Sequence, residues 1–174
     1  MSNLRILVAE DLPADIMILQ RAFTKAGIDV PLHFVCDGQQ AIDYLSGEGL
    51  FADLAPMPLP TMLLLDLKMP RLSGFEVIDW IRRQPGLRRL LVVVFTSSEL
   101  PEDINHAYEL GANSYLVKPA EFTELEKLAR TLEDYWLRLN YCPDCAPDER
   151  TDGPINPLFR TKTEIPPDDE PENN

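Results

Sequence analysis

Cysteine and histidine are scarce in this chain, with three cysteines and two histidines among 174 residues. An odd number of cysteines predicts no disulfide framework. Cys142 and Cys145 form a CxxC pair, but the sequence has no second pair, and His33 and His106 are the two histidines that remain. A structural zinc site uses four such ligands. We therefore expect neither a zinc centre nor a disulfide scaffold, and the role of the CxxC pair stays open.

Long apolar runs are also absent. No run approaches the roughly 20 residues that a helix needs to span a bilayer. The first residues, MSNLRILVAED, contain a short apolar run followed at once by acids, which is not the layout of a signal peptide. We expect a cytoplasmic protein.

Basic residues are outnumbered, with 16 Lys and Arg against 29 Asp and Glu and a net charge of −13. A chain this acidic is repelled by phosphate backbones and by anionic lipid surfaces. The composition therefore predicts neither nucleic-acid binding nor membrane binding.

The acidic charge and the prolines are concentrated near the end of the sequence. Residues 141–174 hold nine acids, three bases and seven of the 16 prolines. Such a segment has too little apolar surface to offset its ordering entropy. We expect one domain over residues 1–140 and a mostly disordered acidic tail over 141–174.

Residues 1–140 alternate between short apolar runs and amphipathic segments. Five strands are expected at 5–9, 31–35, 62–65, 90–95 and 114–117, and five helices at 13–27, 38–47, 74–84, 101–111 and 121–140. Strands that are apolar on both faces indicate a parallel sheet covered by helices on both sides. The expected fold is therefore α/β, a doubly wound five-stranded parallel sheet.

In such a sheet the functional site lies beyond the carboxyl ends of the strands. Glu10 and Asp11 follow the first strand, Asp66 ends the third, Thr96 follows the fourth and Lys118 follows the fifth. Alone, each has an ordinary explanation: a helix cap, a turn, a strand end or a solvated lysine. Together, three carboxylates at one edge repel one another unless a cation joins them, and carboxylate oxygens suit Mg²⁺. Asp66 is then a candidate nucleophile for phosphoryl transfer.

The motifs around these residues resemble the receiver domain of two-component response regulators over about residues 3–140. The matching stretches are AED at 9–11, LLLDLKMP at 63–70, VVVFTSS at 92–98 and GANSYLVKP at 111–119. The resemblance implies a flavodoxin-like strand order of 2-1-3-4-5. It also implies a signalling protein that assists only its own phosphorylation and dephosphorylation.

The resemblance implies that Asp66 is the phosphoacceptor. It implies that Glu10, Asp11, Asp66 and the backbone carbonyl of Lys68 bind Mg²⁺. Lys68 departs from many receivers, which have Asn at this position, and its side chain could reach the phosphoryl group.

The remaining motif residues receive roles in the same way. Thr96 and Ser97 are implied to bind the phosphoryl group together with Lys118. Thr96 and Tyr115 are implied to act as switch residues, and the Lys118–Pro119 peptide bond is implied to be cis.

The long connection EGLFADLAPMPLP at 48–60 and the YWLRLN stretch near residue 140 resemble the single-domain regulators associated with bacterial phytochromes. This resemblance implies a histidine kinase as the partner, with a bacterial phytochrome as the candidate. It also implies a homodimer through the fourth helix, fifth strand and fifth helix, with Tyr135 among the contacts.

Two other functions are compatible with this fold. One is a flavodoxin-like cofactor binder, which would need a phosphate-binding loop after the first strand, where this chain has the acidic stretch EDLPAD. The other is a receiver-like scaffold that is never phosphorylated, although such proteins usually lose one of the key residues, and all are present here.

Overall fold

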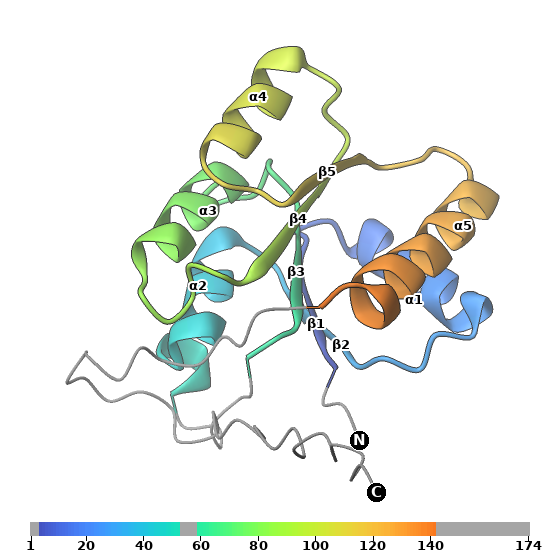
Figure 1. The fold of residues 1–174 in the computed structure, drawn as a ribbon, viewed down its shortest axis with the longest axis horizontal. Coiled ribbons are helices and arrows are strands. Elements are labelled where there is room, and N and C mark those ends of the chain that lie inside the picture. Colours follow the sequence, from blue (N-terminus) through green and yellow to red (C-terminus); the bar gives the residue numbers. More distant parts are fainter. Residues whose placement is uncertain (1–3, 53–58, 142–174) are drawn as a thin grey trace, which may run out of the picture.

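The structure is a computed structural model that describes residues 4–52 and 59–141. Its centre is a five-stranded parallel sheet with the order β2-β1-β3-β4-β5. The strands are β1 (Ile6–Ala9), β2 (Leu32–Val35), β3 (Met62–Leu65), β4 (Leu91–Thr96) and β5 (Ser114–Val117). The expected fold and strand order are confirmed (Figure 1).

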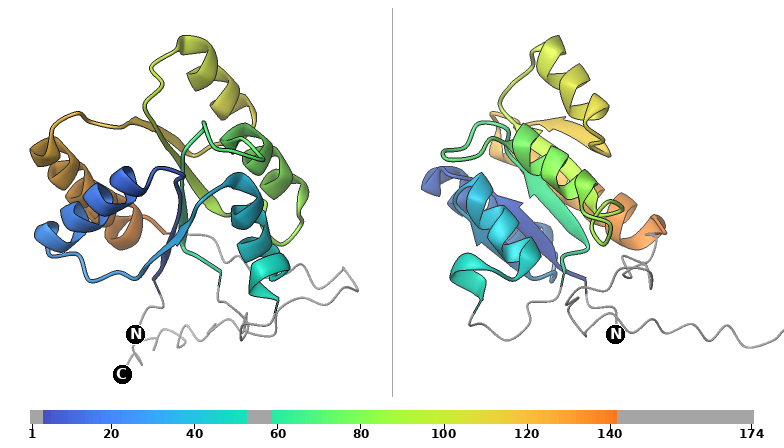
Figure 2. Two further views of the ribbon diagram at one scale, coloured as in Figure 1. Left: turned by 180° about the vertical axis from the view of Figure 1, so that it is seen from behind. Right: turned by 90° about the vertical axis from the view of Figure 1, so that its left-hand side faces the viewer.

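Helices cover both faces of the sheet, as Figures 1 and 2 show. One face carries α2 (Gly38–Ser46), α3 (Gly74–Arg83) and α4 (Pro101–Glu109), and the other carries α1 (Pro13–Ala26) and α5 (Phe122–Leu132). A short 3-10 helix, Gly49–Phe51, follows α2. The two layers leave the strand ends as the accessible edges of the sheet.

The central strands β1 and β3 are entirely apolar because each of their side chains enters one of two cores. Along β1, Leu7 and Ala9 pack under α2, α3 and α4, whereas Ile6 and Val8 pack under α1 and α5. All four residues are buried. A two-residue period therefore places alternate side chains in opposite cores, which is why no polar residue stands in β1 or β3.

Residues at the ends of α1 and α3 fix where these helices begin and where α1 ends. Ser73 and Glu76 form a capping box at the start of α3, with the Ser73 hydroxyl accepting from the Glu76 amide. Pro13 occupies the first turn of α1, and Gly27 ends it in the left-handed region at φ 75°. These three ends lie within a residue of the positions expected from the sequence.

The end of the last helix differs from the expected single α-helix over 121–140. The α-helix ends at Leu132, and a π-helical segment continues over Glu133–Leu139. The wider π-helix shifts side-chain positions away from the 3.6-residue period. Trp136 still packs on the core, but Leu139, three residues later, is 70 % exposed.

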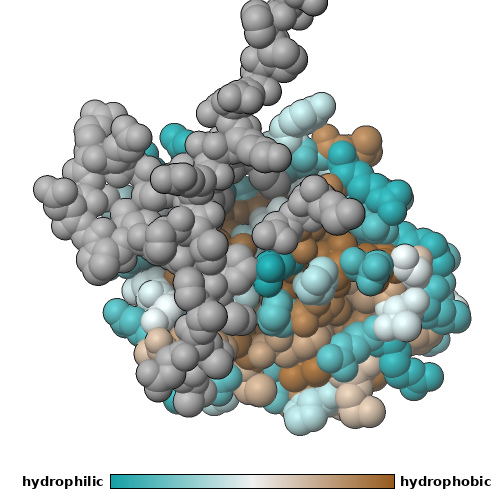
Figure 3. Space-filling model, turned by 90° about the horizontal axis from the view of Figure 1, so that it is seen from below, coloured by the Kyte–Doolittle hydropathy of each residue, from teal (hydrophilic) through white to brown (hydrophobic). Residues whose placement is uncertain are grey.

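The amino ends of the strands form the lower edge of the sheet in Figure 1. Seen from this side in Figure 3, apolar residues occupy the centre of the described surface and hydrophilic residues its margin. Within the described residues, no helix is long and apolar enough to cross a membrane. The expected acidic tail, including Cys142 and Cys145, lies outside the described residues apart from Tyr141.

Candidate functional site

Asp66 lies directly after β3, at the carboxyl edge of the sheet. Its backbone N–H donates to the Ala9 carbonyl at 3.0 Å, which continues the pairing of β3 with β1. One carboxylate oxygen, Oδ1, accepts from the Leu67 amide at 2.6 Å. Asp66 is 6 % exposed, so the fold holds this carboxylate in place at the edge of the core.

Gly74 allows the loop after Asp66 to fold back closely. A Cβ at Gly74 would lie 2.3 Å from the Asp66 carbonyl oxygen, and this atom is backbone that cannot turn aside. The Gly74 amide donates to the Leu67 carbonyl at 3.0 Å. The glycine therefore lets the start of α3 pack directly against the residue that carries the candidate nucleophile.

The structure brings Glu10, Asp11 and Asp66 together as the sequence predicts. One oxygen from each carboxylate lies within 4.8 Å of the others. β1 and β3 are neighbours at the point where the strand order reverses, so their carboxyl ends supply all three residues. This set of oxygen donors fits a hard divalent cation such as Mg²⁺.

Lys118 reaches across the edge from the end of β5 and pairs with three carboxylates. Its Nζ donates to Glu10 Oε2 at 2.6 Å, to Asp15 Oδ2 at 2.8 Å and to Asp66 Oδ2 at 2.9 Å. The Lys118 side chain is 14 % exposed. The expected convergence of Lys118 with the acids is confirmed, and Asp15 is a partner that the sequence did not identify.

Burial and pairing set the charge states of this cluster. Burial raises the pKa of Glu10 above its usual range, and the hydrogen bond from Lys118 opposes this only in part. Burial by itself lowers the pKa of Lys118, but its hydrogen bonds to Asp15, Glu10 and Asp66 outweigh burial and raise it above the ordinary value. The ammonium is therefore charged at neutral pH and compensates the carboxylates.

Thr96 is the last residue of β4 rather than the first residue after it, and it is fully buried. Ser97 is exposed, and Ser98 is buried with its hydroxyl bonded to Asp103. The Tyr115 hydroxyl donates to the Ser98 carbonyl at 3.1 Å, and burial raises the pKa of Tyr115. The loop after β4 thus links the buried Thr96 to the Tyr115 ring.

Two further predictions concern Lys68 and the Lys118–Pro119 peptide bond. Lys68 is exposed, and its amide lies 3.4 Å from Asp66 Oδ1, whereas the role of its carbonyl as a metal ligand stays a prediction. The expectation of a cis Lys118–Pro119 bond is wrong, because the described residues contain no cis peptide bond. Trans is the lower-energy isomer, and with it the Lys118 amide still donates to the Thr96 carbonyl at 2.8 Å.

Tyr135 lies in the π-helical segment after α5, away from this edge. Its side chain is 53 % exposed, and its ring meets the Trp136 ring edge-on at 4.8 Å between centroids. The site therefore does not include Tyr135, and its role in a dimer interface stays a prediction.

The fold and the residues at this edge agree with comparisons to known proteins. The family model of the response regulator receiver domain matches residues 6–130. The probable methanogenesis regulatory protein FilR2 of Methanothrix harundinacea is 38 % identical over 141 residues, which is 79 % of this chain and 86 % of that protein.

Two solved structures are similar over nearly their whole length. A response regulator in red light signaling of R. palustris is 40 % identical with a TM-score of 0.76, covering 80 % of this chain and 98 % of that one. The phosphorylated cyanobacterial phytochrome response regulator RcpA is 34 % identical with a TM-score of 0.74, covering 82 % and 99 %.

Proposed function

Because this chain belongs to the response regulator receiver family, we propose that it is a single-domain response regulator that accepts a phosphoryl group on Asp66 from a histidine kinase. The observation that best supports this role is the Lys118 ammonium, 2.9 Å from the Asp66 carboxylate at the edge of the sheet. A cation in this position offsets the charge of a phosphoryl group on Asp66. The chain would assist its own phosphorylation and dephosphorylation without acting on other substrates.

Glu10, Asp11 and Asp66 would hold Mg²⁺, with the Lys68 carbonyl as a further ligand. When bound, the cation would neutralise the oxygens of the phosphoryl group. The chain supplies the other contributions. Burial and the Leu67 amide orient the Asp66 carboxylate, and its Oδ2 faces Lys118.

The Thr96 hydroxyl and the exposed Ser97 would bind the new phosphoryl group beside Lys118. We propose that Thr96 then moves toward it and that Tyr115 changes position in response. The Tyr115 hydroxyl bond to the Ser98 carbonyl supports this coupling, because movement of the loop after β4 must change or break that bond.

The two other functions fit the site less well. A cofactor binder of the flavodoxin type would have to place a phosphate against Glu10 and Asp11, and these carboxylates repel it. A scaffold that is never phosphorylated has no need for Lys118 to be held against Asp66.

Incubation with acetyl phosphate and Mg²⁺ tests the phosphoacceptor. Intact-mass measurement should find one added phosphoryl group on the wild type and none on Asp66→Asn, because the amide is not a nucleophile. Asp79→Asn, at a partly exposed position on α3, should label like the wild type. Labelling of Asp66→Asn, or labelling that persists in EDTA, contradicts the assignment.

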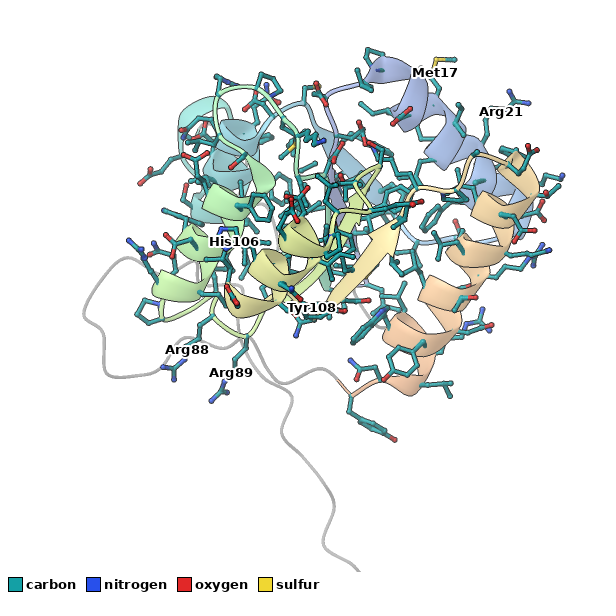
Figure 4. The ribbon with its side chains drawn as sticks, turned by 90° about the horizontal axis from the view of Figure 1, so that it is seen from above. Met17, Arg21, Arg88, Arg89, His106 and Tyr108 are labelled. Carbon is teal, nitrogen blue, oxygen red and sulfur yellow. The ribbon has the colours of Figure 1, made fainter. Side chains whose placement is uncertain are left out.

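We propose a bacterial phytochrome as the kinase, because the two similar structures belong to phytochrome and red-light signalling. Three exposed apolar residues at or near the start of α1 offer it a contact surface: Leu12, Met17 and Ile18. Figure 4 shows Met17 on the outer side of α1. Phosphotransfer from a purified phytochrome kinase should be faster than from an unrelated histidine kinase. Equal rates refute the pairing.

We also propose a homodimer through α4, β5 and α5. Tyr108, Val117 and Tyr135 are exposed on or next to these elements, and β5 is an edge strand. A two-fold interface places the same patch on both partners and needs about 1,000 Å² in total. Analytical ultracentrifugation should detect a dimer that Tyr135→Ala weakens and Met17→Ala, on α1, does not. A monomer in both the free and phosphoryl-mimic states refutes the dimer.

A further inference from the structure

The three hydrogen bonds of Lys118 use its full capacity as a donor. An ammonium group has three N–H donors and no acceptor. In this structure Glu10, Asp15 and Asp66 each accept at hydrogen-bond distance from Nζ. A phosphoryl oxygen can therefore bind Lys118 only if one of these carboxylates gives up its contact.

Asp15 is the contact that is easiest to exchange. The side chains of Glu10 and Asp66 are 4 % and 7 % exposed, whereas that of Asp15 is 34 % exposed. Before the bond to phosphorus forms, releasing Glu10 or the still ionised Asp66 would leave a buried carboxylate without its cation, which is costly, but a carboxylate that is one-third exposed can exchange its partner for water.

The surroundings of Asp15 leave room for this exchange. Asp15 and Lys118 both line a cavity of about 510 Å³ between α1 and α5. Arg21 lines the same cavity, and in Figure 4 it lies on the side of α1 that faces away from the sheet. Asp15 stands in the first turn of α1, so a change in its side chain does not require the helix to move.

We propose that Asp15 is a positioning residue that occupies Lys118 in the unphosphorylated protein and is displaced by a phosphoryl oxygen. This inference rests on the proposed function of Asp66. Asp15 keeps Lys118 aligned on the site but also opposes the reaction, because its negative charge repels the incoming group and takes one of the three donors. Asp15 therefore limits how readily the site is phosphorylated.

The reaction with acetyl phosphate shows where this charge acts. A bond forms between phosphorus and an Asp66 carboxylate oxygen, the phosphorus–oxygen bond to the acetyl group breaks, and acetate leaves with the electron pair. The product carries a dianionic phosphoryl group beside Lys118. Asp15→Asn removes one nearby negative charge and weakens the competition for Nζ.

The test compares labelling rates at an Mg²⁺ concentration that saturates each variant. Asp15→Asn should label about fivefold faster than the wild type, as expected from removing one unit charge at contact distance in a solvated site. Its half-saturation concentration for beryllofluoride, a phosphoryl mimic followed by NMR, should fall by a similar factor. Asp15→Glu, which keeps the charge, should restore wild-type behaviour.

Asp79→Asn is the matched control, because it makes the same change of net charge at a helical, ion-paired and 40 % exposed position. It should leave both quantities unchanged. If Asp15→Asn labels at the wild-type rate or more slowly, the placeholder role is overturned. If the wild type itself takes no label on Asp66, the proposed function fails first, so the two failures are distinguishable.

Discussion

At the scale of single residues, Asp37 combines two interactions in one carboxylate. It caps α2, with Oδ1 accepting from the Gln40 amide at 2.8 Å, and it forms an ion pair with Arg71 in the loop after β3. Burial alone would raise the pKa of Asp37, but the Arg71 guanidinium and the Gln40 amide outweigh it and hold the pKa below its ordinary value. Asp37 thereby ties α2 to the loop that follows Asp66.

Replacement of Asp37 should destabilise the fold in a pH-dependent way. Asp37→Asn keeps a capping side chain and should lower the free energy of unfolding by about 1 kcal/mol, while Asp37→Ala also loses the cap and should cost about 2 kcal/mol. Because the folded-state pKa is depressed, this stability is present above the unfolded value of 3.8 and is lost as pH falls through the folded value.

Urea unfolding between pH 7 and pH 3 measures this dependence. The difference between the wild type and Asp37→Asn should be constant near neutrality and shrink below about pH 4. A difference that grows as pH falls contradicts the sign of the pKa shift.

Arg71 has an unusual backbone conformation for a residue with a side chain. Its φ of 66° lies in the left-handed region, where glycine is at ease and other residues are strained. Arg71→Ala and Arg71→Gly both lose the ion pair, but Arg71→Gly should be more stable than Arg71→Ala by about 1 kcal/mol. Thermal unfolding of the two variants provides the measurement, and equal stability would mean that this conformation carries no strain.

The site residues at strand ends could be predicted from the sequence. A site residue on a helix could not, because its role depends on which way the helix turns its side chain. Glu10, Asp66 and Lys118 were found because parallel strands end at one edge. Asp15 was missed because an acid in the first turn of a helix is already explained by the helix dipole. The strained Arg71 carries no sequence signal.

At the scale of elements, Arg82 joins α3 to the residues just before β4 and β5, at the amino ends of these strands. Its guanidinium donates to the Gly111 carbonyl at 2.9 and 2.7 Å, to the Leu90 carbonyl at 2.9 Å and to Asn113 Oδ1 at 3.0 Å. Asn113 Oδ1 also accepts from the Val92 amide at 2.9 Å. One side chain thus satisfies backbone carbonyls from two separate turns.

Loss of Arg82 should therefore cost more than loss of its neighbour. Arg82→Met leaves partly buried carbonyls without donors and should lower the free energy of unfolding by about 3 kcal/mol. Arg83 is exposed and pairs with Asp79, so Arg83→Met should change stability by less than about 0.5 kcal/mol. Urea denaturation of both variants tests this, and similar losses would refute the tie through Arg82.

The same contrast explains which elements the sequence predicted well. The strands follow from continuous apolar runs, and α1 and α3 follow from their end residues. The change from α-helix to π-helix at Glu133 was not predictable, because the apolar period continues through Trp136 and the change depends on packing. Arg82 in α3 looks like an ordinary solvated helix residue in the sequence.

At the scale of the whole molecule, two of the last three side chains that the structure describes are exposed. Leu139 is 70 % exposed and Tyr141 is 98 % exposed. A truncated protein ending at Asn140 should therefore fold and take a phosphoryl group from acetyl phosphate at a rate close to that of the full chain. If truncation abolishes labelling while circular dichroism remains native, the acidic segment is part of the mechanism.

The ion pair between Lys118 and Glu10 joins residues 108 positions apart. The charge balance of the site therefore depends on β5, the last strand in the sequence. Until β5 pairs with β4, the acids brought together by β1 and β3 lack Lys118 as their counter-charge. Contacts this distant in sequence form late and slow folding. Refolding should therefore accelerate when dissolved salt screens these carboxylates, which stopped-flow measurements at increasing ionic strength can follow. Lys118→Met should refold at a rate close to that of the wild type but unfold faster, since the ion pairs of Lys118 form late in folding.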